Sequence, residues 1–369
     1  MIVGLLCPFN KNTGVGRYGI HLLQGLLRLN VDVIPIFFGD FELPTGWDSN
    51  YIEIPLKTSS RYLRPILYPH LSKRYLRSCN FDILHSNGTY YLEPDILTLH
   101  EVHKYMIRTR KIWHLKQLLP WEIATLQYEK KNLKSGKVKK IICLSQGEKR
   151  EVMESYKVPE EKIVVIPNGV DLNVFRPDRI KRKEIRENLR IGKNELVLMF
   201  SGHDFERKGL RYVIKALPML KDKNNVRLIV VGRGNSKPYR NLAQELKVLD
   251  KVIFAGFVPD ITEYYAASDI FVFPTAYEAF SLATLEAVAS GLPILATKVN
   301  GTEELIMEGY NGFFIRRDPK DIAEKLNILI EDDNLRKQMS RNARKTAEKY
   351  SWDEVAKRTL EVYEELIKK

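Results

Sequence analysis

Cysteine is scarce in this chain, which has only three cysteines among its 369 residues, at positions 7, 79 and 143. An odd number at such wide spacing excludes a disulfide framework and also the paired spacing of a zinc site. Cys7 and Cys143 fall in apolar runs that are typical of buried strands. We therefore expect the cysteines to be small residues of the core.

Long hydrophobic runs are also missing, since no uninterrupted apolar stretch approaches the ~20 residues that cross a bilayer as a helix. The first apolar run, residues 2–9, is too short and too poorly flanked for a signal peptide. Internal repeats and low-complexity segments are absent, because the 17 prolines and 21 glycines are spread along the chain. These absences predict a soluble, cytoplasmic, globular protein.

Positive charge, in contrast, is abundant. The formal net charge of +13 implies an acidic partner, but it does not distinguish among nucleic acid, an anionic membrane and a phosphorylated substrate. Nucleic acid is the least favoured of the three, because the chain contains no recognised nucleic-acid-binding module. We expect no nucleic-acid partner.

The order of apolar runs predicts two α/β domains. Runs bounded by Pro and Gly, typical of buried parallel strands, alternate with helical patterns in both halves, as in doubly wound sheets. Residues 176–193 are highly charged and poor in aromatics, which suits a domain connection. The predicted domains are therefore 1–175 and 176–351, and the amphipathic segment 352–369 could pack on either of them.

The most informative stretch, residues 268–297, predicts a βαβ unit. A buried strand over 269–274 precedes a helix with Ser281 as its N-cap and Gly291 just past its end. Ligands of such units bind where strands end and helices begin, and free N–H groups there favour an anion such as phosphate. Glu278 lies before the helix and Glu286 in its second turn, which indicates a nucleotide-sugar site.

Two cations follow another predicted strand, residues 195–201. Arg207 and Lys208 stand at the start of a predicted helix, where the helix dipole disfavours positive charge unless an anion is shared with them. A bidentate Arg beside a point-charge Lys is suited to clamp a diphosphate. Two adjacent basic residues are more often a solvated surface, so the hypothesis depends on their place at a strand end.

Weaker signals come from the N-terminal half. In the loop 10–16 before a helix predicted to start near Arg17, Gly14 and Gly16 let backbone approach a ligand, although a plain tight turn is about as consistent. His100 ends a buried strand, where ligands gather, but structural histidines are also common there.

Basic residues interleaved with aromatics occupy 57–77 and 104–140, and this composition suits an anionic lipid surface. A solvated, poorly ordered excursion explains 57–77 equally well. Pro65 and Pro69 argue against one long helix in this segment.

The chain resembles family 4 glycosyltransferases over nearly its whole length. The motif E-x7-E is present as Glu278 and Glu286, and FERKGL, VIPNGVDLNVFRP, GFV and the N-terminal glycine loop occur in the family's order. The resemblance implies the GT-B fold, two Rossmann-like domains facing a cleft, with the C-terminal helix crossing back to the N-terminal domain. It also implies a retaining hexosyltransferase (EC 2.4) that uses a nucleoside-diphosphate sugar without a metal or cofactor, and the chain has no Asp-x-Asp motif.

The resemblance assigns roles to residues. Arg207 and Lys208 would hold the donor diphosphate, Glu278 the donor sugar hydroxyls, and Glu286 the ribose. His100 would contact the sugar near the reacting carbon. The turn of Gly232 and Arg233 and the segment Gly256, Phe257 and Val258 would flank the nucleotide base. The remaining donor-side positions are Gly14, Gly16, Phe280, Ser281 and Leu282. Glu101, Ala279 and Ser281 depart from the family's usual residues, which puts details of sugar recognition in doubt.

Several functions remain open on the sequence. The acceptor is a glycolipid or cell-surface glycan precursor at the inner face of the membrane, or a soluble acidic metabolite. An epimerase or hydrolase of nucleotide sugars with the same fold needs no acceptor. A non-catalytic sensor of sugars or nucleotides is disfavoured by the clustered charged groups.

Overall fold

The computed structural model describes residues 1–11, 13–39, 50–56, 58, 60, 62–108 and 119–368. The chain divides into two compact units, the N-terminal unit of residues 1–169 with the segment from Trp352 on, and the C-terminal unit of Val170–Ser351. The predicted boundary at 175 lies too late, because Arg344 donates to the carbonyls of Leu172 and Phe175 and holds this stretch on the C-terminal unit.

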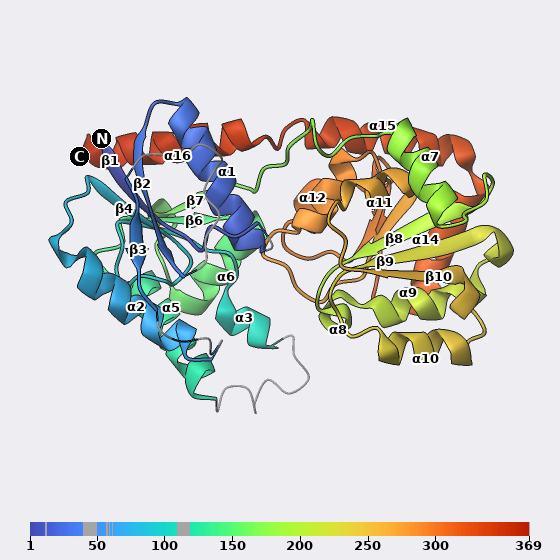
Figure 1. The fold of residues 1–369 in the computed structure, drawn as a ribbon, viewed down its shortest axis with the longest axis horizontal. Coiled ribbons are helices and arrows are strands. Elements are labelled where there is room, and N and C mark those ends of the chain that lie inside the picture. Colours follow the sequence, from blue (N-terminus) through green and yellow to red (C-terminus); the bar gives the residue numbers. More distant parts are fainter. Residues whose placement is uncertain are drawn as a thin grey trace. The chain divides into compact units, whose positions relative to one another are not determined.

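The N-terminal unit is built on a parallel sheet in the order β3-β2-β1-β4-β5-β6-β7 (Figure 1). Its register places Leu6 of β1 between Ile36 of β2 and Ser86 of β4. The strands are β1 (Ile2–Leu6), β2 (Asp32–Phe38), β3 (Ile52–Ile54), β4 (Ile83–Asn87), β5 (Ile96–Thr98), β6 (Lys140–Cys143) and β7 (Ile163–Val165). The helices are α1 (Gly14–Arg28), α2 (Arg64–Tyr75), α3 (His103–Arg108), α5 (Pro120–Lys134), α6 (Gln146–Tyr156) and α16 (Trp352–Ile367), with 3₁₀ turns at Leu76–Ser78 and Glu160–Lys162.

Two sequence predictions for this unit are wrong. Helix α1 begins at Gly14 rather than near Arg17, because the Thr13 side chain accepts from the Gly16 N–H and caps the helix there. Helix α2 is one 12-residue helix, although it contains both prolines. Pro65 lies in the first turn, where its missing N–H costs nothing, and the buried Pro69 removes a single interior bond.

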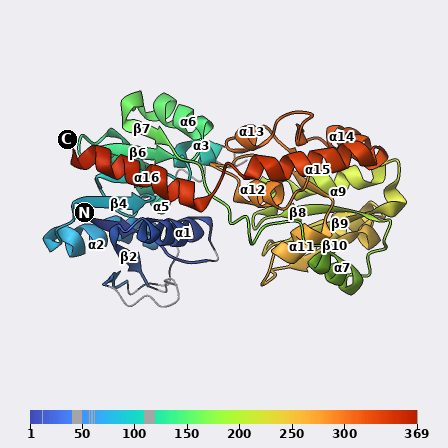
Figure 2. The same ribbon diagram turned by 90° about the horizontal axis from the view of Figure 1, so that it is seen from above.

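The C-terminal helix α16 packs on α1 within the N-terminal unit (Figure 2), as the resemblance implied. Gly25 of α1 allows close approach, since a Cβ there would lie 2.5 Å from the Cβ of Ala356. Arg28 and Asp353 form an ion pair at the exposed end of the contact. In the interior, the Tyr363 hydroxyl lies 2.7 Å from His85 Nδ1.

The C-terminal unit has a second parallel sheet, in the order β10-β9-β8-β11-β12-β13. The strands are β8 (Leu196–Ser201), β9 (Val226–Val231), β10 (Val252–Gly256), β11 (Ile270–Phe273), β12 (Ile294–Ala296) and β13 (Gly312–Phe314). The helices are α7 (Arg179–Asn188), α8 (Phe205–Lys208), α9 (Leu210–Ala216), α10 (Lys237–Glu245), α11 (Thr262–Ala267), α12 (Leu282–Ala289), α13 (Thr302–Leu305), α14 (Pro319–Glu331) and α15 (Asp333–Ala347). The 3₁₀ turns are Leu217–Met219, Lys223–Asn225 and Leu249–Lys251.

The charged segment 176–193, predicted as a domain connection, contains helix α7 of the C-terminal unit. This helix lies beside α11 (Figure 2). The buried Arg186 holds it there by donating to the Ala267 carbonyl at 3.1 Å and approaching Asp269 at 3.4 Å. The sequence analysis also did not identify β13.

All three cysteines are free, and Cys7 and Cys143 are buried, as predicted. In the described part of the chain, no helix combines the length and apolarity that a membrane crossing requires. Because each unit is defined by itself, the predicted cleft between them stays a prediction.

Candidate active site

The βαβ unit at the centre of the C-terminal sheet forms as the sequence predicts. Strand β11 is fully buried, and Ser281 caps α12 by accepting from the Thr284 N–H at 3.2 Å. Gly291 follows the helix with φ +75°, a conformation that favours glycine. Glu278, 8% exposed, lies in the loop between strand and helix, and Glu286, 5% exposed, lies on α12.

Glu278 is the centre of a polar cluster at the carboxyl end of β11. Its Oε1 atom forms an ion pair with the Lys208 ammonium and lies 3.4 Å from Arg207 Nη1. The Thr275 hydroxyl donates to the same oxygen at 2.8 Å. Arg207 Nη1 also donates to the Tyr277 carbonyl at 2.5 Å. The structure therefore brings the two predicted clamp cations and the first glutamate of the motif together.

Lys208 sits in a partly desolvated position. Burial lowers the pKa of its ammonium, while the Glu278 carboxylate opposes this shift. The ammonium also lies 4.9 Å from the centroid of the Phe273 ring, whose face attracts a cation. Lys208 is thus a cation in a largely dehydrated position that is paired with Glu278.

The predicted place of these cations on their helix is wrong. Arg207 and Lys208 end the one-turn helix α8 instead of beginning a longer one. Gly209 stops α8 with φ +82°, and a Cβ there would lie 2.2 Å from the carbonyl oxygen of Pro274. This close approach puts the end of α8 against the end of β11, so the two cations meet Glu278.

Arg317, which the sequence analysis did not identify, contacts the end of α8. Its guanidinium donates to the carbonyls of Arg207 at 3.2 Å and Glu206 at 3.0 Å. The Glu206 carbonyl also accepts from the Gly209 N–H at 3.1 Å and the Arg207 carbonyl from the Ala276 N–H at 2.9 Å, so Arg317 adds a second donor to each. No local pattern around Arg317 signals this role, because its partners lie more than 100 positions earlier in the chain.

Glu286 is held by a second residue that the sequence analysis missed. The hydroxyl of Tyr265, on α11, donates to Glu286 Oε2 at 3.1 Å and also reaches the Ala283 carbonyl at 3.1 Å. Tyr265 is completely buried. The contact fixes the direction in which the Glu286 carboxylate accepts further hydrogen bonds.

The predicted base-flanking segments also lie together. The Gly232 N–H donates to the Gly256 carbonyl at 2.8 Å. The guanidinium carbon of Arg233 lies 3.8 Å from the ring centroid of Phe257, which is 51% exposed. Val258 is buried beside them. This pair offers a flat cationic and aromatic surface.

The residues around the helix start are packed tightly. Phe280 is buried, and its backbone lies against Gly301, where an added Cβ would be 2.8 Å from Phe280 Cα. Leu282 begins α12 directly after the Ser281 cap. Ala279, which departs from the family's glycine, is buried at 7% exposure, so its methyl group fits without being displaced to the surface.

The N-terminal candidates form a separate group in their own unit. Burial lowers the pKa of His100 to about 3, so its ring is neutral at physiological pH. It packs edge-on against Tyr18 at 5.0 Å, and its Nε2 atom has no hydrogen-bond partner among the described residues. Glu101 is exposed and lies 3.4 Å from His103.

The glycines before α1 have different surroundings. A Cβ on Gly16 would lie 2.1 Å from the Asn10 carbonyl oxygen, so glycine is needed there to let Asn10 lie against the helix. Gly14 is exposed in the first turn. The predicted meeting of Gly14, Gly16 and His100 with the donor stays a prediction.

Both halves of the chain match models of known families. Residues 12–174 match "Glycosyltransferase Family 4" and residues 181–346 match "Glycosyl transferases group 1". The chain belongs to the family 4 glycosyltransferases. It is an enzyme of this transferase class, as the E-x7-E motif indicated.

This glycosyltransferase aligns with different shares of its curated relatives. An uncharacterised glycosyltransferase of Methanocaldococcus jannaschii is 28% identical over 95% of this chain and 94% of its own. A Campylobacter jejuni N,N'-diacetylbacillosaminyl-diphospho-undecaprenol α-1,3-N-acetylgalactosaminyltransferase is 33% identical over 59% of this chain and 58% of its own. A D-inositol 3-phosphate glycosyltransferase of Corynebacterium glutamicum is 32% identical over 60% and 56%. The chain thus spans little more than half the length of the last two.

Solved structures share the GT-B fold with this glycosyltransferase. WaaG, a glycosyltransferase involved in lipopolysaccharide biosynthesis, superposes with a TM-score of 0.85 at 22% identity, covering 98% of this chain and 99% of its own. HepE of Anabaena in complex with UDP-glucose gives 0.79 at 20% identity, covering 99% and 100%. At such identities the likeness shows the fold alone.

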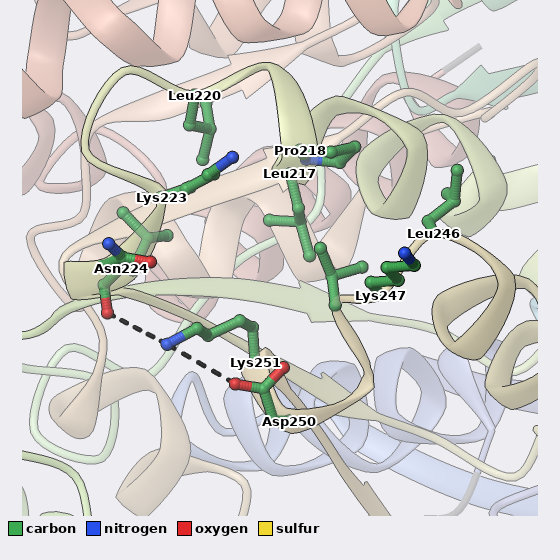
Figure 3. A pocket seen from close by; sticks show the side chains of 11 residues that line it. Leu217, Pro218, Leu220, Lys223, Asn224, Leu246, Lys247, Asp250 and Lys251 are labelled. Carbon is green, nitrogen blue, oxygen red and sulfur yellow. Dashed lines mark hydrogen bonds and ion pairs between the residues drawn. The ribbon is translucent and has the colours of Figure 1, made fainter.

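A cavity of the glycosyltransferase lies away from this site. It has a volume of about 350 Å³ and opens at the amino ends of β9 and β10, the sheet edge opposite Glu278 (Figure 3). Lys251 crosses it, donating to the Asn224 carbonyl at 3.1 Å and pairing with Asp250 at 3.5 Å. In the described residues, no group of three or more His, Cys, Asp or Glu side chains is arranged to hold a metal ion.

Proposed function

We propose that this enzyme transfers a hexose-type sugar, with retention of the anomeric configuration, from a nucleoside-diphosphate sugar to an acceptor hydroxyl, without a metal or other cofactor. One observation carries the proposal: Arg207 and Lys208 converge on a single buried carboxylate oxygen at the carboxyl end of β11. A desolvated pair of cations at a strand end is suited to an anion of similar size, and the donor diphosphate is such an anion.

Charge development on the diphosphate is the step that these residues would assist. As the bond from the anomeric carbon to the phosphate oxygen breaks, negative charge grows on that oxygen, and preorganised cations in a dry site stabilise it. The acceptor oxygen forms the new bond to the anomeric carbon on the same face. Its proton passes to the departing phosphate oxygen, so no separate base is required.

Donor binding would change the contacts of Glu278. The diphosphate takes the place of the Glu278 carboxylate on Lys208 and Arg207, and the carboxylate then accepts hydrogen bonds from donor sugar hydroxyls. Glu286, directed by Tyr265, accepts from the ribose hydroxyls. His100 presents a neutral ring to the sugar. Relatives suggest a uridine donor, because HepE was solved with UDP-glucose and an Escherichia coli relative is named for UDP-Gal.

A membrane-linked acceptor is supported by the surface of α2 and α5. The exposed apolar and aromatic residues of these segments are Tyr62, Leu63, Leu67, Tyr75, Leu119 and Ile123, between 36% and 49% exposed. Tyr62 and Trp121 lie 6.0 Å apart between ring centroids, and Tyr128 on α5 donates to the Ile66 carbonyl on α2 at 3.2 Å. Both curated relatives named for diphosphoundecaprenol act on lipid-linked sugars. Lys57, Arg61 and residues 109–118 of the predicted membrane segments lie outside the described residues.

We therefore place the enzyme at the cytoplasmic face of an anionic membrane. A soluble acidic acceptor is the competing candidate, because two relatives are named D-inositol 3-phosphate glycosyltransferases. Sedimentation with vesicles of phosphatidylglycerol and phosphatidylcholine separates the two. Binding should fall at least about fivefold in Leu63→Asp/Leu67→Asp and stay unchanged in Met219→Asp/Leu249→Asp, a matched pair exposed on the C-terminal unit. Equal binding by both variants would count against the α2–α5 surface.

The reaction itself is tested with a panel of UDP-, GDP- and ADP-sugars and lipid-linked or soluble acceptors. Lys208→Ala and Glu286→Ala should each abolish transfer, whereas Lys223→Ala, at the distant cavity, should not. Full activity in both site variants would remove the proposed site. A product of unchanged mass and inverted stereochemistry by NMR would instead indicate an epimerase, and sugar release without an acceptor a hydrolase.

A further inference from the structure

A groove of about 660 Å³ lies at the edge of the C-terminal sheet opposite Glu278. Its volume is in the range of small-molecule sites, about 300–1,000 Å³. The amino end of β8, the ends of α11 and α12, and the first turns of α7 and α15 form its walls. The groove therefore belongs to one unit and does not overlap the polar cluster around Glu278.

The acidic residues of the groove are already occupied. Each of the four is held by a basic side chain or by backbone N–H groups at a helix start. The contacts are Asp178 with the N–H groups of Ile180 and Lys181, Glu195 with Arg227, Asp269 with Arg182, and Asp333 with Arg336 and Lys337. Asp178 alone has no cationic partner in the described chain, so the five basic side chains of the lining still exceed its four carboxylates by one.

Two cations of the groove, in contrast, are uncompensated. Arg179 and Lys193 are exposed and have neither a hydrogen bond nor an ion pair within the part of the chain that the structure describes. Arg179 is moreover the first residue of α7, whose first turn contains no acid. A cation there opposes the helix dipole by about 0.3–1 kcal/mol, which the N-cap carboxylate of Asp178 offsets in part.

A hydroxyl at the groove is also unused. Ser290, only 4% exposed, lines the groove at the end of α12, and its Oγ atom has no hydrogen-bond partner in the described chain. Buried polar atoms without partners are rare in folded proteins and point to a missing water or ligand. The Ser290 hydroxyl thus lies just beneath the surface of the hollow that Arg179 and Lys193 also line.

We propose that this groove is a second anion site, which takes a small polyanion such as a phosphorylated metabolite and is separate from the donor diphosphate site. Several oxygens on one ligand are needed, because Arg179 and Lys193 come from different walls, the start of α7 and the turn before β8. A polyanion gains charge-assisted hydrogen bonds from both, which are stronger than bonds between neutral groups. Binding is expected to weaken with salt, since both cations face solvent.

Calorimetric titration of the full chain with tripolyphosphate at low salt tests the site. The wild-type protein should bind two equivalents, one at Arg207 and Lys208 and one in the groove. Arg179→Ser/Lys193→Ser should lose the groove equivalent, with affinity falling at least about tenfold, or ~1.4 kcal/mol. Lys223→Ser/Lys247→Ser changes the charge equally at the cavity of Figure 3 and should keep both equivalents.

The variants separate the two sites from each other. Lys208→Ala should lose only the donor-site equivalent, so its failure to do so would count against that site and leave the groove untouched. The groove site is overturned if Arg179→Ser/Lys193→Ser binds as many equivalents as the wild type, if Lys208→Ala binds none, or if the Lys223/Lys247 control loses as much as the groove variant does.

Discussion

The ammonium group of Lys208 and the carboxylate of Glu278 form an ion pair across 70 positions of sequence. Both side chains are largely buried, at 13% and 10% exposure. Without this partner a buried ammonium tends to lose its proton, so Glu278 keeps the cation charged in the free enzyme. The same carboxylate competes with any diphosphate for Lys208. Glu278 thus keeps Lys208 charged in the free enzyme and also occupies the position that a diphosphate would take.

Removing the charge of Glu278 should therefore separate binding from turnover. In Glu278→Gln near pH 7, we expect UDP to bind a few times more tightly, about 1 kcal/mol, because no carboxylate competes for Lys208 and Arg207 and the bound diphosphate itself supplies the negative charge that keeps Lys208 protonated. Transfer should fall at least about tenfold, because the proposed contacts to the sugar hydroxyls are lost. Calorimetry and initial rates measure the two effects, with Glu206→Gln on the same helix as the control. Weaker UDP binding would contradict the competition.

Tyr265 is expected to act as a positioning residue for Glu286. Tyr265→Phe removes only the hydroxyl that donates at 3.1 Å, so Glu286 loses its fixed direction and should discriminate less between ribose and 2′-deoxyribose in the donor. KM for the donor should rise about three- to tenfold with a smaller change in kcat. Tyr264→Phe, on the neighbouring position of α11, is the matched control.

The outcomes with 2′-deoxy donors separate two failures. If Glu286→Gln reduces the discrimination but Tyr265→Phe does not, Tyr265 has no positioning role. If neither variant reduces it, the proposed ribose contact of Glu286 is itself wrong.

Two glycines of the base-flanking segments should respond differently to alanine. Gly232 has φ +144°, and a Cβ there would lie 1.8 Å from the Gly202 carbonyl oxygen, so backbone must move. Gly256 has φ +71° but open space around it, so alanine meets only conformational strain. We expect losses in unfolding free energy of more than ~3 kcal/mol for Gly232→Ala and about 1 kcal/mol for Gly256→Ala, measured by urea denaturation. Equal losses would show that the close contact relaxes.

The N-terminal unit should lose stability as pH rises toward 8. Burial raises the pKa of Glu148 from 4.5 to about 8, and its Oε1 atom has no hydrogen-bond partner among the described residues. Between these pH values the folded chain keeps a proton that the unfolded chain has released. Stability therefore falls with increasing pH, by at most ~1.4 kcal/mol per unit.

Glu148→Gln removes this proton and should flatten the dependence. The melting temperature of the variant minus that of wild type should increase between pH 5 and pH 8. Thermal scans that follow the transition of the N-terminal unit measure this difference. Glu161 is an exposed acid, so Glu161→Gln is the control and should keep the pH dependence of the wild type. A Glu148→Gln slope equal to that of wild type would show that Glu148 is ionised in the folded protein.

Much of the fold and part of the site could be predicted from the sequence because their signals are local. Buried strands appear as apolar runs, and Ser281 and Gly291 mark the ends of α12 through their own capping chemistry. The errors occur where a distant partner decides. The sequence analysis predicted Arg207 and Lys208 at the start of a helix from the local pattern. In the structure, the contact of Gly209 with Pro274 ends α8 after one turn. From Pro65 and Pro69 we expected no single long helix in this segment. Helix α2 forms nevertheless, because those two positions tolerate proline.

The sequence by itself determined the two parallel sheets, the family motif and the pair of glutamates, because periodicity and spacing are written along the chain. Only the tertiary structure decided which groups meet: Lys208 with Glu278, Tyr265 with Glu286, and Arg317 with the end of α8. The physical reason is that ion pairs and hydrogen bonds depend on distances of about 3 Å in space, and the spacing of residues along the chain does not encode such distances when the partners lie on separate elements.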